Sequence, residues 1–343
     1  MSRNLSTLRR TPGRTLAEAP WATRLGALPL TLASIALLLA AAAVALYSRE
    51  QMTWTLVGPL ALFTLNLGCA IYSNAVFRRQ TALLLFHLAL IAVALLVALG
   101  RLTYLKGQAE VTDGAVFDGQ LIGFESGPWH PWRLDRVRFE NQGFSIHYTA
   151  GPQREKTRNR VAWTDAQGIR QSAIIGDMDP LLREGYRFYT SPNKGFAPVF
   201  AWYPKAGAAV TGSVHLPGYP VNEYRQSREW TPPGSRQPVW IQLDFDEVIL
   251  DPEKPSEFRL PSRHKLIVNS GNQWHELQPG GRLALADGTL VYKELRSWMG
   301  YNVFYDWTLP WLLAACSFGT LCLGWHFWAK FAARPWRETG SED

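Results

Sequence analysis

Charged side chains are missing from four long stretches of this 343-residue chain. A helix needs about 20 apolar residues to cross roughly 30 Å of hydrocarbon, and each stretch reaches that length. Four such stretches exclude a soluble enzyme, and we predict that each forms a membrane-spanning helix. The stretches are residues 25–47, 54–76, 81–100 and 307–329.

Cysteine is scarce as well, because the chain has three and none of them lies between residues 101 and 306. That region is polar and long enough to bury a core of its own. Proteins outside the cytoplasm often use disulfides, but this region must fold without one. Cys69, Cys316 and Cys322 all lie in the apolar stretches, where we interpret them as small packing residues.

The sequence also lacks the short motifs of hydrolases, phosphate-binding enzymes and zinc proteases. We therefore expect no enzyme activity from this chain by itself. Its net charge of +7 does not indicate nucleic-acid binding, because residues 101–306 hold 24 basic and 23 acidic side chains. The excess positive charge lies mainly in the segments that flank the apolar stretches.

The placement of these flanking charges predicts an orientation. Ten Lys and Arg residues lie in the segments that flank the predicted helices on one side, and one lies in the short loop on the other side. Because cytoplasmic flanks are enriched in Lys and Arg, we predict a membrane protein with both termini in the cytoplasm. The predicted segments are a cytoplasmic N-terminal segment at 1–24, three helices within 25–100, an extracytoplasmic domain at 101–306, a fourth helix at 307–329 and a cytoplasmic tail at 330–343.

Residues 101–306 carry the patterns of β-structure. Apolar residues occupy every second position from Val239 to Phe245, which is typical of a strand with one buried face. Asp287-Gly288 separates two strand-like runs and predicts a hairpin turn. We therefore predict a β-rich, sandwich-like domain between the third and fourth helices. Further predicted elements are strands at 159–165, 169–175, 186–191 and 198–203, and a long loop from Pro217 to Pro238.

Five of the seven histidines are scattered through the predicted β-rich domain. Their spacing is not typical of a metal site, so we interpret them as surface or strand-edge residues. These five are His130, His147, His215, His264 and His275.

The other two histidines, His87 and His326, lie inside predicted membrane helices, where an ionisable side chain is costly and indicates function. His87 lies about 9 Å from the cytoplasmic end of its helix and His326 about 6 Å, at 1.5 Å per residue. A neutral imidazole in an apolar site is a good axial ligand for haem iron. For His87 the alternatives are a haem ligand and a packing residue, whereas His326, among tryptophans, is more typical of an aromatic belt.

The order of parts and three sequence segments resemble the ResB (CcsB) family of system II cytochrome c biogenesis proteins. The shared order is three helices, a large extracytoplasmic domain and one closing helix. The segments are Asn66, Cys69 and Arg78-Arg79 with Leu85-Phe86-His87-Leu88, then Gly107–Val111 with Asp113-Gly114, and finally Asp179–Leu182 with Gly185–Ser191.

This resemblance implies a membrane subunit that, with a ResC/CcsA-type partner, moves haem b across the membrane and presents it to apocytochrome c. The family's third-helix histidine is regarded as a haem ligand, and His87 occupies the matching position. His326 has no such counterpart. The implied partners are a ResC/CcsA-type protein, apocytochrome c and the lipid bilayer, with no nucleic acid.

Two alternatives of other classes stay open at this point. A membrane electron carrier would hold haem between His87 and His326, and it needs both rings in one cavity. A haem-free envelope scaffold would bind another protein through its external domain, and it would carry no pigment after purification.

The charge distribution makes a direct prediction about topology. An alkaline phosphatase reporter, which is active only outside the cytoplasm, should be silent when it is fused after Asp343. The physical reason is that the short segments on that side of the predicted helices hold ten Lys and Arg residues, against one in the short outer loop. Activity of the fusion would contradict the four-helix topology.

Overall fold

The computed structural model describes residues 21–47, 53–151, 153–222 and 225–332. Several of the basic residues behind the predicted orientation lie outside the described residues. They are Arg3, Arg9, Arg10, Arg14, Arg49, Arg334 and Arg337.

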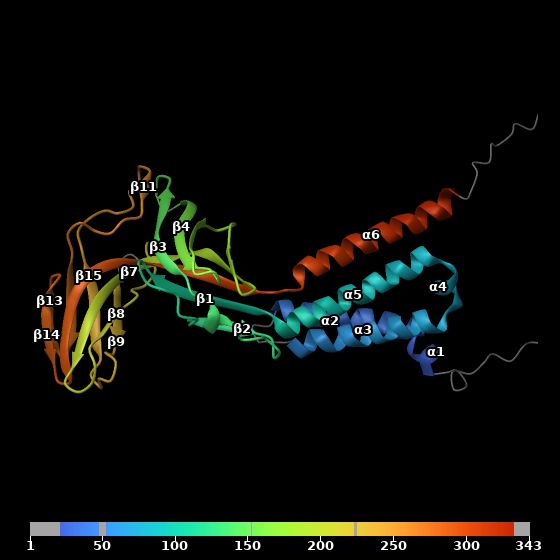
Figure 1. The fold of residues 1–343 in the computed structure, drawn as a ribbon, viewed down its shortest axis with the longest axis horizontal. Coiled ribbons are helices and arrows are strands. Elements are labelled where there is room, and N and C mark those ends of the chain that lie inside the picture. Colours follow the sequence, from blue (N-terminus) through green and yellow to red (C-terminus); the bar gives the residue numbers. More distant parts are fainter. Residues whose placement is uncertain (1–20, 48–52, 152, 223–224, 333–343) are drawn as a thin grey trace, which may run out of the picture. The chain divides into compact units, whose positions relative to one another are not determined.

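The chain divides into two compact units, one helical and one β-rich (Figure 1). The helical unit takes in the residues up to Tyr104, the short piece Gly127–His130 and the residues from Asp306 onward. The β-rich unit comprises Leu105–Ser126 and Pro131–Tyr305. A short connection between two strands, Gly127–His130, thus packs with the helices.

Four helices of the helical unit are long and apolar enough to cross a membrane, as predicted. Their boundaries differ from the predicted ones by a few residues, and the last helix continues to Ala332. The helices are α2 (Leu28–Tyr47), α3 (Thr53–Ser73), α5 (Thr81–Thr103) and α6 (Leu309–Ala332).

Two short helices modify the predicted arrangement. The sequence predicted one helix from residue 25, but a separate turn of helix, α1 (Trp21–Leu25), precedes α2. The connection between α3 and α5 contains another short helix, α4 (Ala75–Arg79). The Asn74 side chain caps α4 by accepting a 3.0 Å hydrogen bond from the backbone N–H of Val76.

A close contact with α3 explains the break between α1 and α2. A Cβ on Gly26 would lie 2.5 Å from the backbone nitrogen of Ala70, so only glycine fits there. The buried Asn66 of α3 donates a 2.5 Å hydrogen bond to the carbonyl of Leu25 and accepts one of 2.8 Å from the Thr31 hydroxyl. The amide of Asn66 therefore satisfies a carbonyl that the interrupted helix leaves free.

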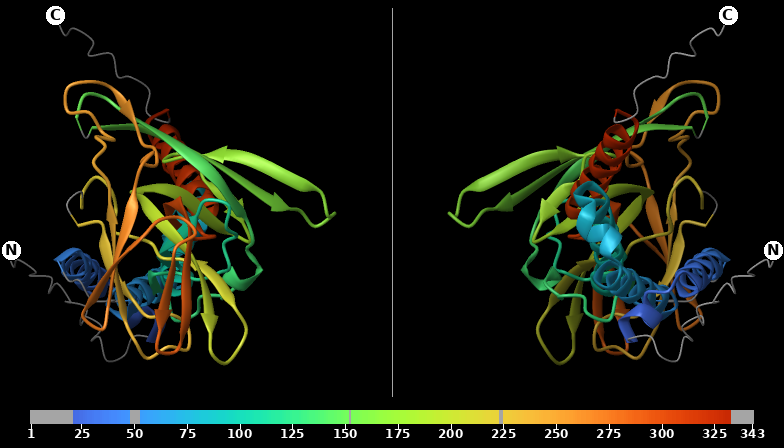
Figure 2. Two further views of the ribbon diagram at one scale, coloured as in Figure 1. Left: turned by 90° about the vertical axis from the view of Figure 1, so that its left-hand side faces the viewer. Right: turned by 90° about the vertical axis from the view of Figure 1, so that its right-hand side faces the viewer.

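Every strand pair in the described part of the β-rich unit is antiparallel. The largest sheet has the order β2-β1-β15-β7-β6, with β14 on β15 and β8 on β7. The other two have the orders β13-β12-β10-β9 and β11-β3-β4-β5, and the β4–β5 hairpin extends away from its neighbours (Figure 2). The strands are β1 (Leu105–Thr112), β2 (Gly123–Ser126), β3 (Glu140–Tyr148), β4 (Arg154–Thr164), β5 (Arg170–Ile175), β6 (Leu181–Arg183), β7 (Tyr186–Pro204), β8 (Val210–Ser213), β9 (Ser227–Trp230), β10 (Val239–Asp244), β11 (Ser256–Glu257), β12 (Lys265–Ser270), β13 (Gln273–Leu277), β14 (Arg282–Leu285) and β15 (Gly288–Tyr305).

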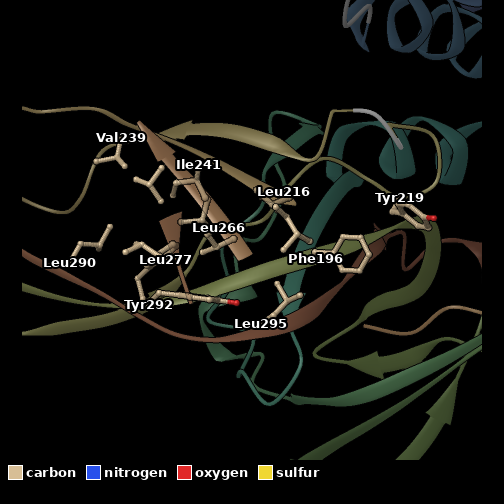
Figure 3. Packing of buried hydrophobic residues seen from close by; sticks show 14 of the residues in the cluster. Phe196, Leu216, Tyr219, Val239, Ile241, Leu266, Leu277, Leu290, Tyr292 and Leu295 are labelled. Atoms are coloured by element: carbon tan, nitrogen blue, oxygen red, sulfur yellow. The ribbon is translucent and has the colours of Figure 1, made fainter. Parts of the chain in front are cut away.

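Two hydrophobic cores fill the β-rich unit, and β7 and β15 contribute to both. In one core, Phe196 of β7 and Tyr292 of β15 pack with Ile241 of β10 and Leu266 of β12 (Figure 3). In the other, the opposite ends of β7 and β15 pack with β1 and β4. The unit is therefore two packed layers at each end, joined by one long pair of strands.

Three predictions for the β-rich region need correction. Residues 186–191 and 198–203 belong to one 19-residue strand, β7, rather than to two. The predicted loop from Pro217 to Pro238 contains the strand β9. Leu285 pairs with Gly288, so Ala286 and Asp287 form the hairpin loop and Gly288 already belongs to β15.

Lys194 of β7 is buried although it carries a charge, with 2% of its surface exposed. Its ammonium lies 5.0 Å from the centre of the Tyr148 ring, and among the described residues no carboxylate forms an ion pair with it. Burial, together with the positive charge of the nearby Arg154, lowers the pKa of Lys194 to about 8. The charged form of Lys194 therefore opposes folding at neutral pH.

Replacing Lys194 with methionine should stabilise the protein by about 1–3 kcal/mol at pH 7. Because the pKa of Lys194 is lower in the folded chain than in the unfolded one, the unfolded chain holds more protons between about pH 8 and 10.5. Stability from this group therefore rises with pH over that window, and Lys194→Met should abolish the rise. Denaturation of the detergent-solubilised full chain, followed by near-UV circular dichroism, measures both effects.

The exposed Lys293 of β15 supplies the matched control, because Lys293→Met changes the same charge without removing a buried one. Equal effects of the two substitutions on the unfolding free energy would contradict a buried, unpaired ammonium at Lys194.

Candidate functional site

His87 lies on α5, six residues after the first residue of the helix, and its ring is half-buried. Its Nδ1 atom lies 2.7 Å from the carbonyl oxygen of Leu83, one helical turn earlier. A carbonyl oxygen can only accept a hydrogen bond, so Nδ1 carries the proton in this geometry. The other ring nitrogen, Nε2, then presents a lone pair, which is the form of imidazole that binds a metal.

Two phenylalanine rings surround His87. Phe77 of α4 lies edge-on with its ring centre 4.7 Å from that of His87, and Phe86 lies at 5.2 Å. The cap at Asn74 sets the start of α4, so it also places Phe77 against α5. The two rings thus place apolar surface against the half-buried imidazole.

This arrangement fits a haem ligand on the chemistry of its donor. The Nδ1–H of the imidazole is directed at a backbone carbonyl, and the neighbours of the ring in α4 and α5 are aromatic or aliphatic. Haem would be bound by Nε2 of His87, with its porphyrin face against apolar side chains. Arg79 at the end of α4 is exposed, and its guanidinium would be available to a haem carboxylate.

His326 lies near the end of α6, and it lines a separate cavity of about 450 Å³. The start of α5 forms the facing wall, with Gln80 and Thr81, and Lys330 lies at the same cavity. His87 is not among the residues that line it, and the described ring contact of His326 is with Phe327 at 5.5 Å. The structure therefore does not bring the two predicted histidines together in one lined site.

A second groove of about 740 Å³ lies between α5 and α6. The two helices approach closely at Ala89 and Gly319, where a Cβ on the glycine would lie 3.2 Å from that of Ala89. Trp307 and Trp311 close one end, and the remaining walls are aliphatic or aromatic. The groove fits an apolar occupant and supplies no iron ligand.

The five other histidines do not share one environment. His147 is exposed, in agreement with the sequence interpretation, whereas His130 is buried and was wrongly interpreted as a surface residue. His130 packs at the end of α5, where its Nδ1 lies 2.8 Å from the carbonyl oxygen of Thr103. His264 is half-buried, and its Nε2 lies 2.8 Å from the Tyr292 hydroxyl. Among the described residues, no group of three His, Cys, Asp or Glu side chains could hold a metal ion.

His215 belongs to a polar cluster that the sequence did not indicate. Its Nδ1 lies 2.9 Å from a carboxylate oxygen of Glu110, and its Nε2 lies 2.8 Å from the Thr112 hydroxyl. Glu110 and Thr112 are two residues apart and therefore share one face of β1, which the sequence pattern could have indicated. His215 lies about a hundred residues away, so its place in the cluster could not be predicted from sequence spacing. A carboxylate, an imidazole and a hydroxyl in this order also occur in enzymes, where the imidazole is the base that activates the hydroxyl as a nucleophile. Thr112 is 5% exposed, however, so its hydroxyl is closed to a substrate and the cluster serves as a buried link between β1 and the segment after β8.

Comparison with other proteins adds no family assignment to this geometry. No known protein-family model matches the chain, and no characterised protein matches it.

Proposed function

We propose that this chain is a haem-handling membrane subunit of cytochrome c maturation, related to the ResB (CcsB) proteins. In this proposal haem is the cargo. The chain accepts haem in the membrane and, with a ResC/CcsA-type partner, passes it to apocytochrome c. The observation that carries the proposal is the half-buried imidazole of His87, whose Nδ1 is occupied by the Leu83 carbonyl and whose Nε2 is free to bind iron.

Each neighbour of His87 has a role in this proposal. The Leu83 carbonyl fixes the tautomer and the ring orientation, and Phe77 and Phe86 place apolar surface against the imidazole. The second axial ligand comes from the partner's helices, since His326 lines a different cavity. The chain itself makes and breaks no covalent bond of haem.

The location is part of the same proposal. The four apolar helices span the bacterial cytoplasmic membrane with both termini in the cytoplasm. The β-rich unit, which lies between α5 and α6 in the chain, is then extracytoplasmic and sandwich-like, and it receives the apocytochrome or the partner. Its lack of cysteine suits this task, because a free thiol there would compete with the thiols of the apocytochrome.

The test compares two single substitutions in cells that also produce a ResC/CcsA-type partner. Haem occupancy of the purified complex, read from its absorption spectrum, should fall about tenfold or more in His87→Ala, because the iron loses a direct ligand. Cytochrome c assembly should fall with it. Free imidazole should restore part of both by filling the vacated position.

His326→Ala is the matched control, because it removes the same side chain from the helix that faces α5. It should retain most of its haem and most of its assembly activity. Equal haem loss in the two variants would favour the electron carrier with two histidine ligands. Full haem occupancy in His87→Ala would remove the ligand assignment, and a colourless wild-type complex would favour the haem-free scaffold.

A further inference from the structure

Three large apolar side chains lie exposed on one edge of the β-rich unit. Ile122, Phe124 and Trp132, which we call the aromatic edge, are 60%, 52% and 54% exposed. The rings of Phe124 and Trp132 lie edge-on with their centres 5.2 Å apart, so the two form one surface. A hollow of about 450 Å³ next to them is lined by Leu121 and Leu134. Contiguous exposed apolar surface of this kind marks an interaction site.

Only a few residues separate the aromatic edge from the C-terminal end of α5 along the chain. Phe124 of β2 pairs with Gly107 of β1, which follows the end of α5 by four residues, or about 13 Å of extended chain. The connection after β2 returns to the helix itself. The N–H of Gly127 donates to the carbonyl of Tyr104, and that of Trp129 donates to the carbonyl of Leu102, both at 2.9 Å.

Glycine is required at the first of these attachments. A Cβ on Gly127 would lie 2.1 Å from the carbonyl oxygen of Leu102, so no other residue allows the chain to approach α5 so closely. The attachment precedes Trp132 by five residues and follows Phe124 by three. Short lengths of chain therefore join the aromatic edge to this attachment on both sides in sequence.

The same end of the helices already carries aromatic residues typical of a membrane surface. Trp307 and Trp311 lie at the start of α6 and are exposed, and the indole N–H of Trp307 donates a 3.0 Å hydrogen bond to the Thr103 hydroxyl at the end of α5. Trp129 is exposed in the connection attached to α5. Tryptophan prefers the headgroup level of a bilayer, so Trp129, Trp307 and Trp311 suit the membrane surface at this end of the helices.

Positive charge lies directly beside the aromatic edge. Arg133, Arg136 and Arg138 follow Trp132 and are exposed, with Asp135 as the single acid among them. Within the described residues, none of the three arginines forms an ion pair. A guanidinium binds phosphate oxygens in a bidentate manner, so exposed arginines at this place suit the phosphates of lipid headgroups.

We infer that the aromatic edge docks into the phospholipid leaflet that surrounds the C-terminal end of α5. Ile122, Phe124 and Trp132 enter the boundary between headgroups and acyl chains, and Arg133 and Arg136 bind lipid phosphates. The inference rests on the membrane placement in the proposed function, but not on haem binding. It gives the β-rich unit a second attachment to the membrane besides its covalent connections to α5 and α6.

Site-directed spin labelling of the full chain tests this inference. A background with Cys69→Ala, Cys316→Ala and Cys322→Ala receives single cysteines at Phe124→Cys or Trp132→Cys, which carry the nitroxide. The labelled protein is placed in nanodiscs of phosphatidylcholine and phosphatidylglycerol. Collision of the nitroxide with oxygen, which concentrates among acyl chains, is compared with collision with a polar nickel chelate.

Two control positions bracket the expected result. Trp274→Cys labels an equally exposed tryptophan on β13 of the same unit, and Leu95→Cys labels an exposed position in the middle of α5. The ratio of oxygen to nickel collisions at Phe124→Cys and Trp132→Cys should be several-fold higher than at Trp274→Cys and lower than at Leu95→Cys.

A ratio at Phe124→Cys equal to that at Trp274→Cys, with Leu95→Cys still shielded from nickel, would overturn the docking inference alone. A low ratio at Leu95→Cys as well would overturn the membrane placement and with it the proposed function. Spin–spin broadening between copies at Phe124→Cys would assign the aromatic edge to a protein dimer instead of lipid, and it would overturn the inference too.

Discussion

The pairing of β7 with β15 is the interaction on which the β-rich unit depends. The ladder runs from Tyr186 opposite Tyr305 to Pro204 opposite Gly288, and both hydrophobic cores use its side chains. Because side chains alternate between the two faces of a sheet, a slip by one residue would expose the buried face along the whole ladder. Both cores would be lost together, so they cannot form independently of this pair.

Breaks in the ladder explain why the sequence predicted two strands where the structure has one. Lys194 pairs with Met299 and Thr190 pairs with Tyr301, so the three residues between Thr190 and Lys194 lie opposite Gly300 alone. These residues, Ser-Pro-Asn, resemble a turn in sequence, but they form a bulge that the partner strand accommodates. Gly300 makes this possible, because a Cβ there would lie 2.6 Å from the Ser191 hydroxyl. That distinction depends on a partner about a hundred residues away, which local pattern cannot supply.

The sequence did predict the helices and strands that are determined by neighbouring residues in the chain. The alternation from Val239 follows from one buried face of β10, and the apolar helices follow from length and composition. His87 was recognised because a polar residue in an apolar helix stands out in sequence, and its carbonyl partner lies on the same helix. The Glu110–His215 contact was missed because its two residues lie on separate strands and segments. The sequence predicted the hairpin turn at Asp287-Gly288, one residue later than the loop Ala286-Asp287 in the structure. Gly288 is required because its backbone approaches the Tyr203 carbonyl closely, and not because it forms the turn.

The hydrogen bond at His87 bears on what kind of haem protein the proposal describes. A carboxylate behind an imidazole makes the ring a more basic and tighter iron ligand, whereas a neutral backbone carbonyl, as at Leu83, does so less. A permanent electron carrier gains from tight ligation by two side chains of its own. A subunit that hands its haem onward gains from one moderate bond, because release then requires breaking a single contact. The carbonyl at Leu83, together with the separate cavity of His326, therefore supports transit of haem over its permanent retention.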